Sequence, residues 1–163
     1  MLTPAIQAEH LTIQFDSEVL LKDINLAIDP GEVFVIIGPS GHGKSVFMKM
    51  LAGILPPSSG KVFIEGHDLY EATEKKRIEI MQKMGMLFQK NALFDSLTVA
   101  ENIAFPLREV SNCTEFEIKK PIDFFLEAVA IPHARDLYPD EISGGMQKRL
   151  GIARALALYP EII

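Results

Sequence analysis

The residues best suited to chemistry in this chain are Gly38 to Ser45, which read Gly-Pro-Ser-Gly-His-Gly-Lys-Ser. The glycines let the backbone bend sharply, so that its N–H groups converge and form a nest for phosphate oxygens. Lys44 is long enough to reach the β- and γ-phosphates of a nucleotide, and the Ser45 hydroxyl suits a nucleotide-bound Mg²⁺. The spacing therefore predicts a P-loop. Its expected nucleotide contacts are Gly38, Pro39, Ser40, Gly41, His42, Gly43, Lys44 and Ser45, with His42 contributing mainly its backbone amide.

The segments on either side of this loop are those that a P-loop needs. Val33 to Ile37 are all apolar and mostly β-branched, which predicts a strand buried on both faces, as in a parallel sheet. Val46 to Ala52 follow as an apolar stretch of helical length that Gly53 should end. The start of this helix would add unpaired N–H groups to the phosphate site.

Two further polar stretches are candidates for the same site. Gln89 follows the apolar run Met84 to Phe88, and residues at the carboxyl end of such a strand face the ligand crevice of an open α/β sheet. A loop residue without function is the alternative. Ser143 is a natural N-cap for the helix that follows, and the two glycines after it leave the helix start bare, where an anion could approach. Simple capping is the alternative there.

Composition limits the class of protein. With 163 residues and 48% hydrophobic side chains, the chain can build one sizeable core, or one core with a smaller lobe. A net charge of −6 argues against nucleic acid as a partner, which would require a basic face. Basic residues do gather locally at Lys148, Arg149 and Arg154, where a solvated helix face is the alternative to a binding patch.

The compartment is indicated by the single cysteine and by the absence of a signal pattern. Cys113 alone excludes an internal disulfide and fits a reducing compartment. The first ten residues have neither a basic start nor an apolar core of signal-peptide length, and no later run approaches a membrane span. We therefore expect a cytoplasmic protein whose membrane role, if it has one, depends on a partner.

The N-terminal part of the chain predicts antiparallel strands. Ala5 to Phe15 and Val19 to Ile28 carry alternating apolar residues around a short connection, which favours a hairpin, and Lys61 to Glu65 should return as a third strand. Asp29-Pro30-Gly31 predicts a turn before the P-loop strand.

The remainder of the chain predicts helices. Thr73 to Lys83 favours a helix, and Thr98 and Thr114 each begin a capping box with a glutamate three residues later. Pro106 should end or kink the first of the capped helices near Phe105. The second should bury the stripe Ile118, Ile122, Phe125, Leu126 and Val129, and the helix after Ser143 should run to Pro160, where Glu161 begins a last strand.

The order and spacing of these motifs resemble the ATP-binding subunits of ABC transporters over essentially the whole chain. Ile142 to Gln147, Ile-Ser-Gly-Gly-Met-Gln, resembles the signature motif, Gln89 matches the Q-loop, and Phe15 matches the aromatic position that stacks on adenine. The resemblance implies catalytic roles for Lys44 and Gln89 and Mg²⁺ contacts from Ser45 and Gln89. It implies further nucleotide contacts from Phe15, Ser143, Gly144, Gly145, Met146 and Gln147.

Within that family, Met86 to Glu109 is most similar to ATPases of the lipid-asymmetry (Mla) or toluene-tolerance type. The resemblance implies three partners: a second copy of the ATPase subunit in a head-to-tail dimer, a membrane permease, and an MCE-domain lipid-binding protein. It implies phospholipid transport and a location on the inner face of the cell membrane through the permease. Leu93 and Phe94, on the loop from Asn91 to Leu97, should dock a short permease helix. Importers of amino acids and other solutes share much of this framework.

The expected fold is α/β, a P-loop NTPase with an incomplete RecA-like core. Residues 1–32 and 61–66 should form an antiparallel β lobe, residues 33–60 and 84–89 the core, and residues 93–149 a helical subdomain. In this family the strand beginning at Ile162 should end in a Walker B aspartate and the catalytic glutamate, and neither is present. We therefore expect residues 1–163 alone to bind ATP weakly, to leave Val33 to Ile37 without neighbours and to be inactive as an ATPase.

Two other functions are compatible with the same residues. One is an ABC protein of DNA repair or translation, without a transport role. The other is a nucleotide-binding module that never hydrolyses its ligand, which the missing Walker B permits. The sequence names neither a transported substrate nor a direction of transport.

Overall fold

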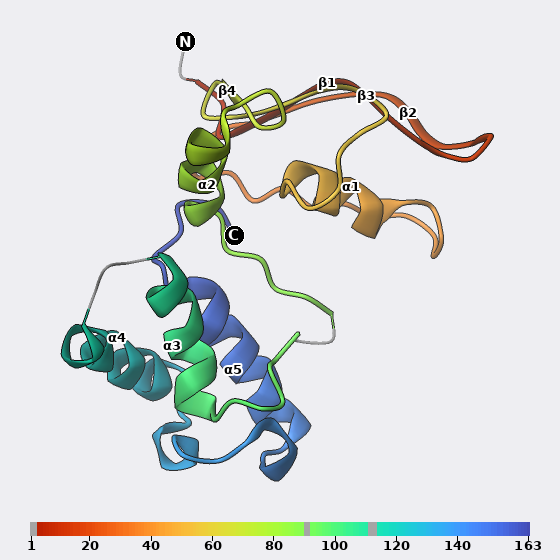
Figure 1. Ribbon diagram of the computed structural model, residues 1–163. Helices are drawn as coiled ribbons and strands as arrows, with labels where there is room; N and C mark the ends of the chain where they lie inside the picture. The colour runs from red at the N-terminus through yellow and green to blue at the C-terminus, as the bar shows by residue number, and fades with distance from the viewer. Residues whose placement is uncertain (1–2, 90–91, 111–113) are drawn as a thin grey trace. The chain divides into compact units, whose positions relative to one another are not determined.

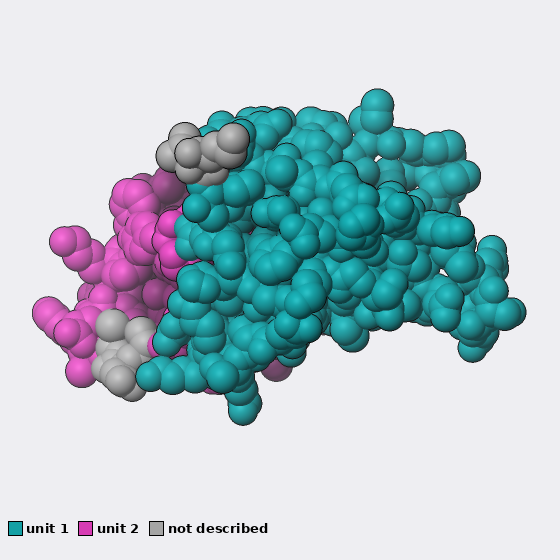
Figure 2. Space-filling model, turned by 90° about the horizontal axis from the view of Figure 1, so that it is seen from above, with its two compact units in different colours: residues 1–81 teal, residues 82–163 magenta. Residues whose placement is uncertain are grey.

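The computed structural model describes residues 3–89, 92–110 and 114–163, which form two compact units. The first unit comprises residues 1–81 and the second residues 82–163 (Figure 2). The predicted P-loop lies in the first unit, whereas Gln89 and the Ser143 helix lie in the second.

The first unit is built on a four-stranded antiparallel sheet with the order β2-β1-β3-β4. Its strands are β1 (Ile6–Phe15), β2 (Glu18–Ile28), β3 (Ser59–Ile64) and β4 (His67–Asp68). The β1–β2 hairpin and the third strand are present as expected from alternation, and the two-residue strand β4 was not predicted. One face of the sheet is apolar and buried, with Ala8, Leu11, Ile13, Val62 and Ile64 each at most 3% exposed.

Helix α1 (Lys44–Leu51) follows the predicted P-loop, and Figure 1 shows it on one side of the sheet. It buries Phe47, Met50 and Leu51, and it ends as expected before Gly53, which adopts the left-handed φ of 72°. The Tyr70 hydroxyl lies 2.6 Å from the carbonyl oxygen of Met50, at the end of the helix. Burial raises the pKa of Tyr70 to about 12, so the hydroxyl keeps its proton for this contact. Helix α2 (Glu74–Gln82) occupies the predicted helical segment.

The two parallel strands predicted beside the P-loop are not formed. Residues 33–37 pair with no strand among the described residues, and Val33 and Ile37 are 89% and 86% exposed. Residues 84–88 contribute only an isolated parallel bridge between Met84 and Ile162. Apolar runs of this kind become strands only when neighbours on both sides supply hydrogen bonds and cover their side chains.

The second unit is a helical cluster around one apolar core (Figure 1). Its α-helices are α3 (Val99–Val110), α4 (Glu115–Ala128) and α5 (Gly144–Leu156), with short 3₁₀ turns at Pro132–Ala134 and Pro139–Glu141. Both predicted capping boxes are present: the carboxylates of Glu101 and Glu117 accept the N–H groups of Thr98 and Thr114. The predicted stripe of α4 is buried at Ile118, Ile122, Phe125 and Leu126, and half-buried at Val129.

Two predicted helix ends differ from the structure. Pro106 does not end α3, which continues to Val110. Leu107 is buried in the core, and the guanidinium of Arg108 makes two hydrogen bonds of 2.7 Å to Glu115, so tertiary contacts hold the turn that proline weakens. Helix α5 ends at Leu156 rather than reaching Pro160, because the chain turns at Tyr159, where φ is 52°.

Within the described part of the chain, the structure contains no helix with both the length and the apolar character to cross a membrane.

Candidate nucleotide-binding site

The loop between residues 38 and 43 has the backbone geometry that its glycines allow. Gly41 and Gly43 adopt φ angles of 84° and 81°, in the left-handed region that favours glycine. Gly43 is the N-cap of α1, so the helix begins at Lys44, directly after the bend. Its first N–H groups therefore lie at the loop, where the positive end of the helix dipole favours an anion.

Lys44 closes the loop from the inside. Its Nζ donates hydrogen bonds of 2.7 Å to the carbonyl oxygen of Gly38 and 2.6 Å to that of Pro39. The ring Nδ1 of His42 lies 3.1 Å from the carbonyl oxygen of Ser40, within the same bend. The Lys44 ammonium is therefore held by two backbone carbonyl groups at the start of the loop.

Access to the loop is open from solvent. Pro39, Ser40, His42 and Ser45 are exposed, so the Ser45 hydroxyl in the first turn of α1 is available to a ligand. Gly43 is the exception, because it is buried against Leu20 and Leu21 of β2.

Phe15 belongs to the same unit as the loop. It is the last residue of β1 and is 48% exposed, directly before the left-handed turn residue Asp16. A half-exposed ring at a hairpin tip is suited to stacking on a base, as the resemblance implies.

Gln89 lies in the second unit and its side chain is exposed. The parallel strand expected to carry it is absent beyond the bridge at Met84. Its role as a catalytic residue and Mg²⁺ contact beside Lys44 and Ser45 therefore stays a prediction. Among the described residues there is no group of three or more His, Cys, Asp or Glu side chains that could hold a metal ion.

The helix start at Ser143 is capped as predicted, and the two glycines that follow Ser143 are exposed. The Ser143 hydroxyl accepts the N–H of Met146 at 3.3 Å, which makes it the N-cap of α5. Gly144 and Gly145 are exposed, and a Cβ added to Gly144 would meet no heavy atom within 4 Å. Neither residue has a positive φ. Nothing in the described fold therefore requires glycine at these two positions.

Met146 and Gln147 have contacts inside the second unit. Met146 is half-buried against the helical core, and the Gln147 side-chain amide donates a 2.7 Å hydrogen bond to the carbonyl oxygen of Pro139. These contacts fix the segment before α5. The predicted nucleotide contacts of both residues stay predictions.

The basic residues of α5 differ from one another. Lys148 is exposed, whereas Arg149 donates to the carbonyl oxygens of Val129 and Ala130 after α4. Arg154 donates to the carbonyl oxygen of Ala92 at 2.5 Å, and its guanidinium lies 5.6 Å from the ring centre of Phe94. Both arginines are therefore used to hold the second unit together.

Sequence reasoning did not find the pocket that Arg154 helps to line. This pocket, which we call the aromatic pocket, has a volume of about 500 Å³ and is mostly apolar. Phe94 and Phe105 meet in it with ring centres 4.5 Å apart. Its lining combines residues from three separate segments, so no local sequence pattern predicts the pocket. Representative lining residues are Met84, Met86, Phe94, Phe105, Arg154 and Leu158.

Comparison with known proteins places these features in context. A family model described as "ABC transporter" matches residues 21–163. The chain is 46% identical over 159 residues to the probable ribonucleotide transport ATP-binding protein mkl of Mycobacterium leprae, covering 98% of this chain and 46% of that relative. It is 37% identical to the intermembrane phospholipid transport system ATP-binding protein MlaF of Haemophilus influenzae, covering 97% of this chain and 60% of MlaF.

Solved structures give the same result for the fold. An ATP-binding cassette solved as a dimer in a post-hydrolysis state with ADP and Pi superimposes with a TM-score of 0.86 at 30% identity, covering 95% of this chain and 70% of that one. The cbiO1 protein of Clostridium perfringens, part of the cbiONQ transporter complex, superimposes with a TM-score of 0.81 at 30% identity over 97% of this chain and 63% of that one. The expected α/β P-loop fold is confirmed, and this chain spans about half the length of the curated relatives above.

Proposed function

This chain belongs to the ABC transporter family, and from that premise we propose that it supplies the ATP-binding subunit of a transporter, coupling ATP binding and hydrolysis to transport. The observation that supports the proposal is the loop before α1, in which the glycine bends, the helix start and the Lys44 ammonium lie within a few residues of one another, and we assign the phosphates of ATP to it. Phosphoryl transfer to water depends on positioning and on charge neutralisation, and these groups supply both to a triphosphate.

The residues of the loop also fit a nucleotide-bound Mg²⁺. The exposed Ser45 hydroxyl offers one hard oxygen ligand beside the phosphate site, and the described residues hold no acidic cluster that would bind the ion alone. Mg²⁺ bound with a nucleotide normally takes most of its ligands from phosphates and water, so one hydroxyl is appropriate. The ion would neutralise phosphate charge, and Gln89 is the second side chain that we assign to it.

A head-to-tail pair of subunits accounts for the glycines after Ser143. Glycine at the start of a helix costs stability relative to alanine, and here it fills no tight space. A bare helix start is useful when another molecule approaches closely, and we assign that role to ATP on the P-loop of a second copy. A related cassette is dimeric with ADP and Pi bound, which supports this arrangement.

The aromatic pocket is the surface that we assign to the membrane permease. Phe94 lines this pocket and is 40% exposed, so an apolar helix of the permease can bury its ring. Leu93, the other residue predicted to dock the permease, is half-buried and packs against the helical core, so it is less accessible than docking requires. Asn91 of the expected docking loop lies outside the described residues. Through this contact the subunit would sit on the inner face of the cell membrane, in the cytoplasm.

Phospholipid is the substrate that we propose, with an MCE-domain lipid-binding protein as a further partner. The support is the similarity to MlaF, together with the resemblance of Met86 to Glu109 to that type of ATPase. The ribonucleotide-transport relative shares a higher sequence identity with this chain than MlaF does. The identity of the transported substrate therefore most needs a test. An ABC ATPase without a transport role, or a module that binds nucleotide without hydrolysing it, are the competing functions.

Co-purification followed by phosphate release tests the proposal. The full-length protein, tagged and purified from its own membranes, should bring down a permease, and the complex in phospholipid nanodiscs should hydrolyse ATP. Phe94→Ala should release the permease and leave ATP binding unchanged. Phe116→Ala, which removes a more exposed ring on α4, should retain the permease and also leave ATP binding unchanged. A protein that hydrolyses ATP but never recovers a membrane subunit supports the ATPase without a transport role, and one that only binds ATP supports the module.

A further inference from the structure

The β1–β2 hairpin contains three bulges, of which the first two compensate each other, and the sequence pattern alone did not show them. Between the pairs Ala8–Leu26 and Leu11–Ile24, β1 has one extra residue, at Glu9–His10. Further along the hairpin, β2 has extra residues, first at Lys22–Asp23 and then at Leu20. Each bulge shifts the side chains that follow it to the other face of the strand.

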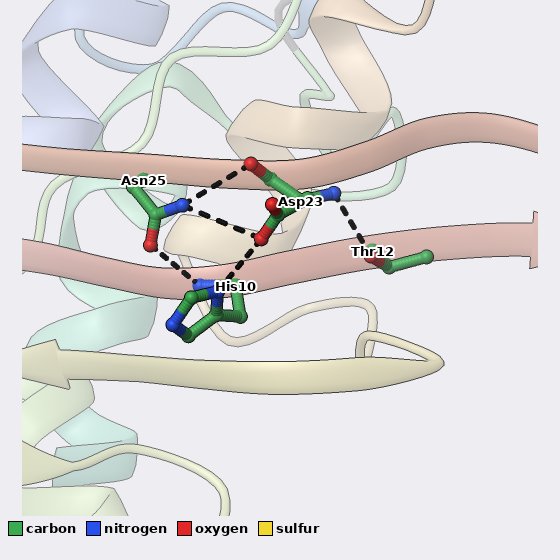
Figure 3. Close-up of polar contacts among 4 residues, drawn as sticks. All are labelled: His10, Thr12, Asp23 and Asn25. Carbon is green, nitrogen blue, oxygen red and sulfur yellow. Dashed lines mark hydrogen bonds and ion pairs between the residues drawn. The ribbon is translucent and has the colours of Figure 1, made fainter.

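Side chains opposite the first two bulges hold them in place (Figure 3). The Asn25 Oδ1 accepts the N–H of His10 at 2.9 Å, and the Thr12 hydroxyl accepts the N–H of Asp23 at 3.0 Å. His10 and Asp23 both have left-handed φ angles, 50° and 54°, and the His10 ring Nδ1 lies 2.7 Å from Asp23 Oδ1. The ladder therefore loses regular pairing without losing hydrogen bonds, and its register is fixed.

The consequence appears at the third bulge, on the strand that returns toward the P-loop. In a regular strand Leu20 and Leu21 would point to opposite faces of the sheet. Here Leu21 pairs with Ile13 and Val19 with Gln14, so Leu20 is the extra residue. Both leucines contact Gly43: a Cβ added there would lie 3.1 Å from the Cγ atom of each.

These contacts connect the β1–β2 hairpin, which carries Phe15, to the phosphate-binding loop at Gly43. Leu20 and Leu21 are half-buried, and the glycine they cover is the buried N-cap of α1 at which the phosphate-binding loop becomes a helix. The same hairpin carries Phe15 at the end of β1. A shift of the hairpin would therefore move both the base platform and the loop.

We infer that Leu20 and Leu21 are positioning residues that hold the phosphate-binding loop in shape through Gly43, so that the hairpin serves phosphate binding as well as base stacking. The inference rests on the proposed function, because it assumes that the loop binds nucleotide. It assigns to the hairpin a role for the triphosphate that is independent of the adenine ring.

Two ligands separate the roles of the hairpin residues in the full-length protein. Mg²⁺-ATP should contact both the Phe15 ring, through its base, and the phosphate-binding loop. Mg²⁺-tripolyphosphate has no base and should contact the loop alone. Leu20→Ala and Leu21→Ala should each weaken both ligands by the same factor, about tenfold, because the loop loses packing. Phe15→Ala should weaken ATP only. Val19→Ala, a neighbouring variant at a side chain 47% exposed, should change neither affinity.

A readout of the loop itself accompanies the titrations. Amide hydrogen exchange at Gly41, Gly43 and Lys44 should speed up in the leucine variants while β1–β3 ladder amides keep their protection, and Leu21→Met should restore both exchange and affinity. If either alanine variant does not fold, Leu20→Val and Leu21→Val decide by the same measurements.

The possible failures are distinguishable. Folded leucine variants that bind tripolyphosphate as the wild type does, or that lose ATP alone as Phe15→Ala should, overturn the inference. If Lys44→Ala leaves tripolyphosphate binding unchanged, the proposed function itself fails. If Lys44→Ala abolishes binding and the leucine variants keep it, only the positioning role fails.

Discussion

The ammonium group of Lys44 lies 2.7 Å from the carbonyl oxygen of Gly38, at the opposite end of the phosphate-binding loop. This contact and the one to Pro39 are hydrogen bonds from a cation to neutral acceptors. Phosphate oxygens are charged and bind such a donor more strongly. A triphosphate that enters the loop can therefore replace the two carbonyl groups as the acceptor of the ammonium's hydrogen bonds. The loop thus holds its main cation in place before any ligand arrives.

The bulge at His10 requires a glycine on the neighbouring strand. A Cβ on Gly60 would overlap the carbonyl oxygen of His10 and lie 2.6 Å from that of Glu9. Gly60→Ala should therefore lower the free energy of unfolding by about 3 kcal/mol, from its left-handed φ of 89° and from the clash. Gly31→Ala is the matched control, because φ there is 80° but no heavy atom lies within 4 Å, and it should cost about 1 kcal/mol. Urea unfolding measures both, and equal losses would contradict the clash.

Asn102 organises the segment that carries Phe94. It is fully buried, its Oδ1 accepts the N–H of Phe94 at 2.9 Å, and its Nδ2 donates to the carbonyl oxygens of Phe94, Leu97 and Thr98. Asn102→Ala should destabilise the protein by about 3 kcal/mol, because buried backbone groups lose their partners. Thr98→Ala removes only a capping hydroxyl nearby and should cost about 1 kcal/mol. Thermal melting compares them, and a neutral Asn102→Ala would show that water replaces the amide.

The two capping boxes predict a loss of stability in acid. Hydrogen bonds from the Thr98 backbone and then its hydroxyl lower the pKa of Glu101 below its ordinary 4.5, and Thr114 lowers that of Glu117 in the same way. A carboxylate with a lowered folded-state pKa stabilises the fold above the ordinary pKa, and this contribution disappears as the pH falls through the folded value. The Glu101→Gln, Glu117→Gln double variant should therefore be less stable at pH 7 and less sensitive to pH below 4.5. Parallel pH–stability curves for both proteins would refute this.

Gly144 should matter to the assembly and not to the fold. Alanine there meets open space and favours the helix, so Gly144→Ala should raise the free energy of unfolding by up to about 1 kcal/mol. In the full-length protein it should also prevent dimer formation with a slowly hydrolysed ATP analogue, measured by light scattering. Lys148→Ala, exposed on the same helix, should leave the dimer intact. Normal dimers of Gly144→Ala would remove the argument for close approach at this helix start.

Local patterns predicted much of this structure. The glycine bends, the capping boxes and the hairpin each depend on residues a few positions apart, so spacing alone was informative. The prediction that residues 33–37 form a buried strand was wrong for this chain, because such burial depends on strands that are not formed beside them. The continuation of α3 through Pro106 was also missed, since Leu107 gains its burial from another helix.

The bulges and the aromatic pocket were beyond sequence reasoning for a related reason. His10 and Asn25 interact only because β1 and β2 are paired in a particular register, and no periodicity specifies an extra residue. Phe94 and Arg154 are 60 positions apart in the sequence and meet through the packing of the second unit. The roles of Gln89 and of the Ser143 helix start likewise depend on a partner or on the other unit, and stay predictions.

Titration of Mg²⁺-ATP into Lys44→Ala tests the central claim most directly. The Lys44 side chain makes its contacts within an exposed loop, so the variant should keep its circular dichroism and melting curve. Losing a charged donor to phosphate in the site should lower the affinity at least about tenfold. Lys49→Ala, exposed on the other end of α1, is the control and should bind as the wild type does. A folded Lys44→Ala variant with unchanged affinity for Mg²⁺-ATP would contradict the assignment of this loop as the nucleotide site.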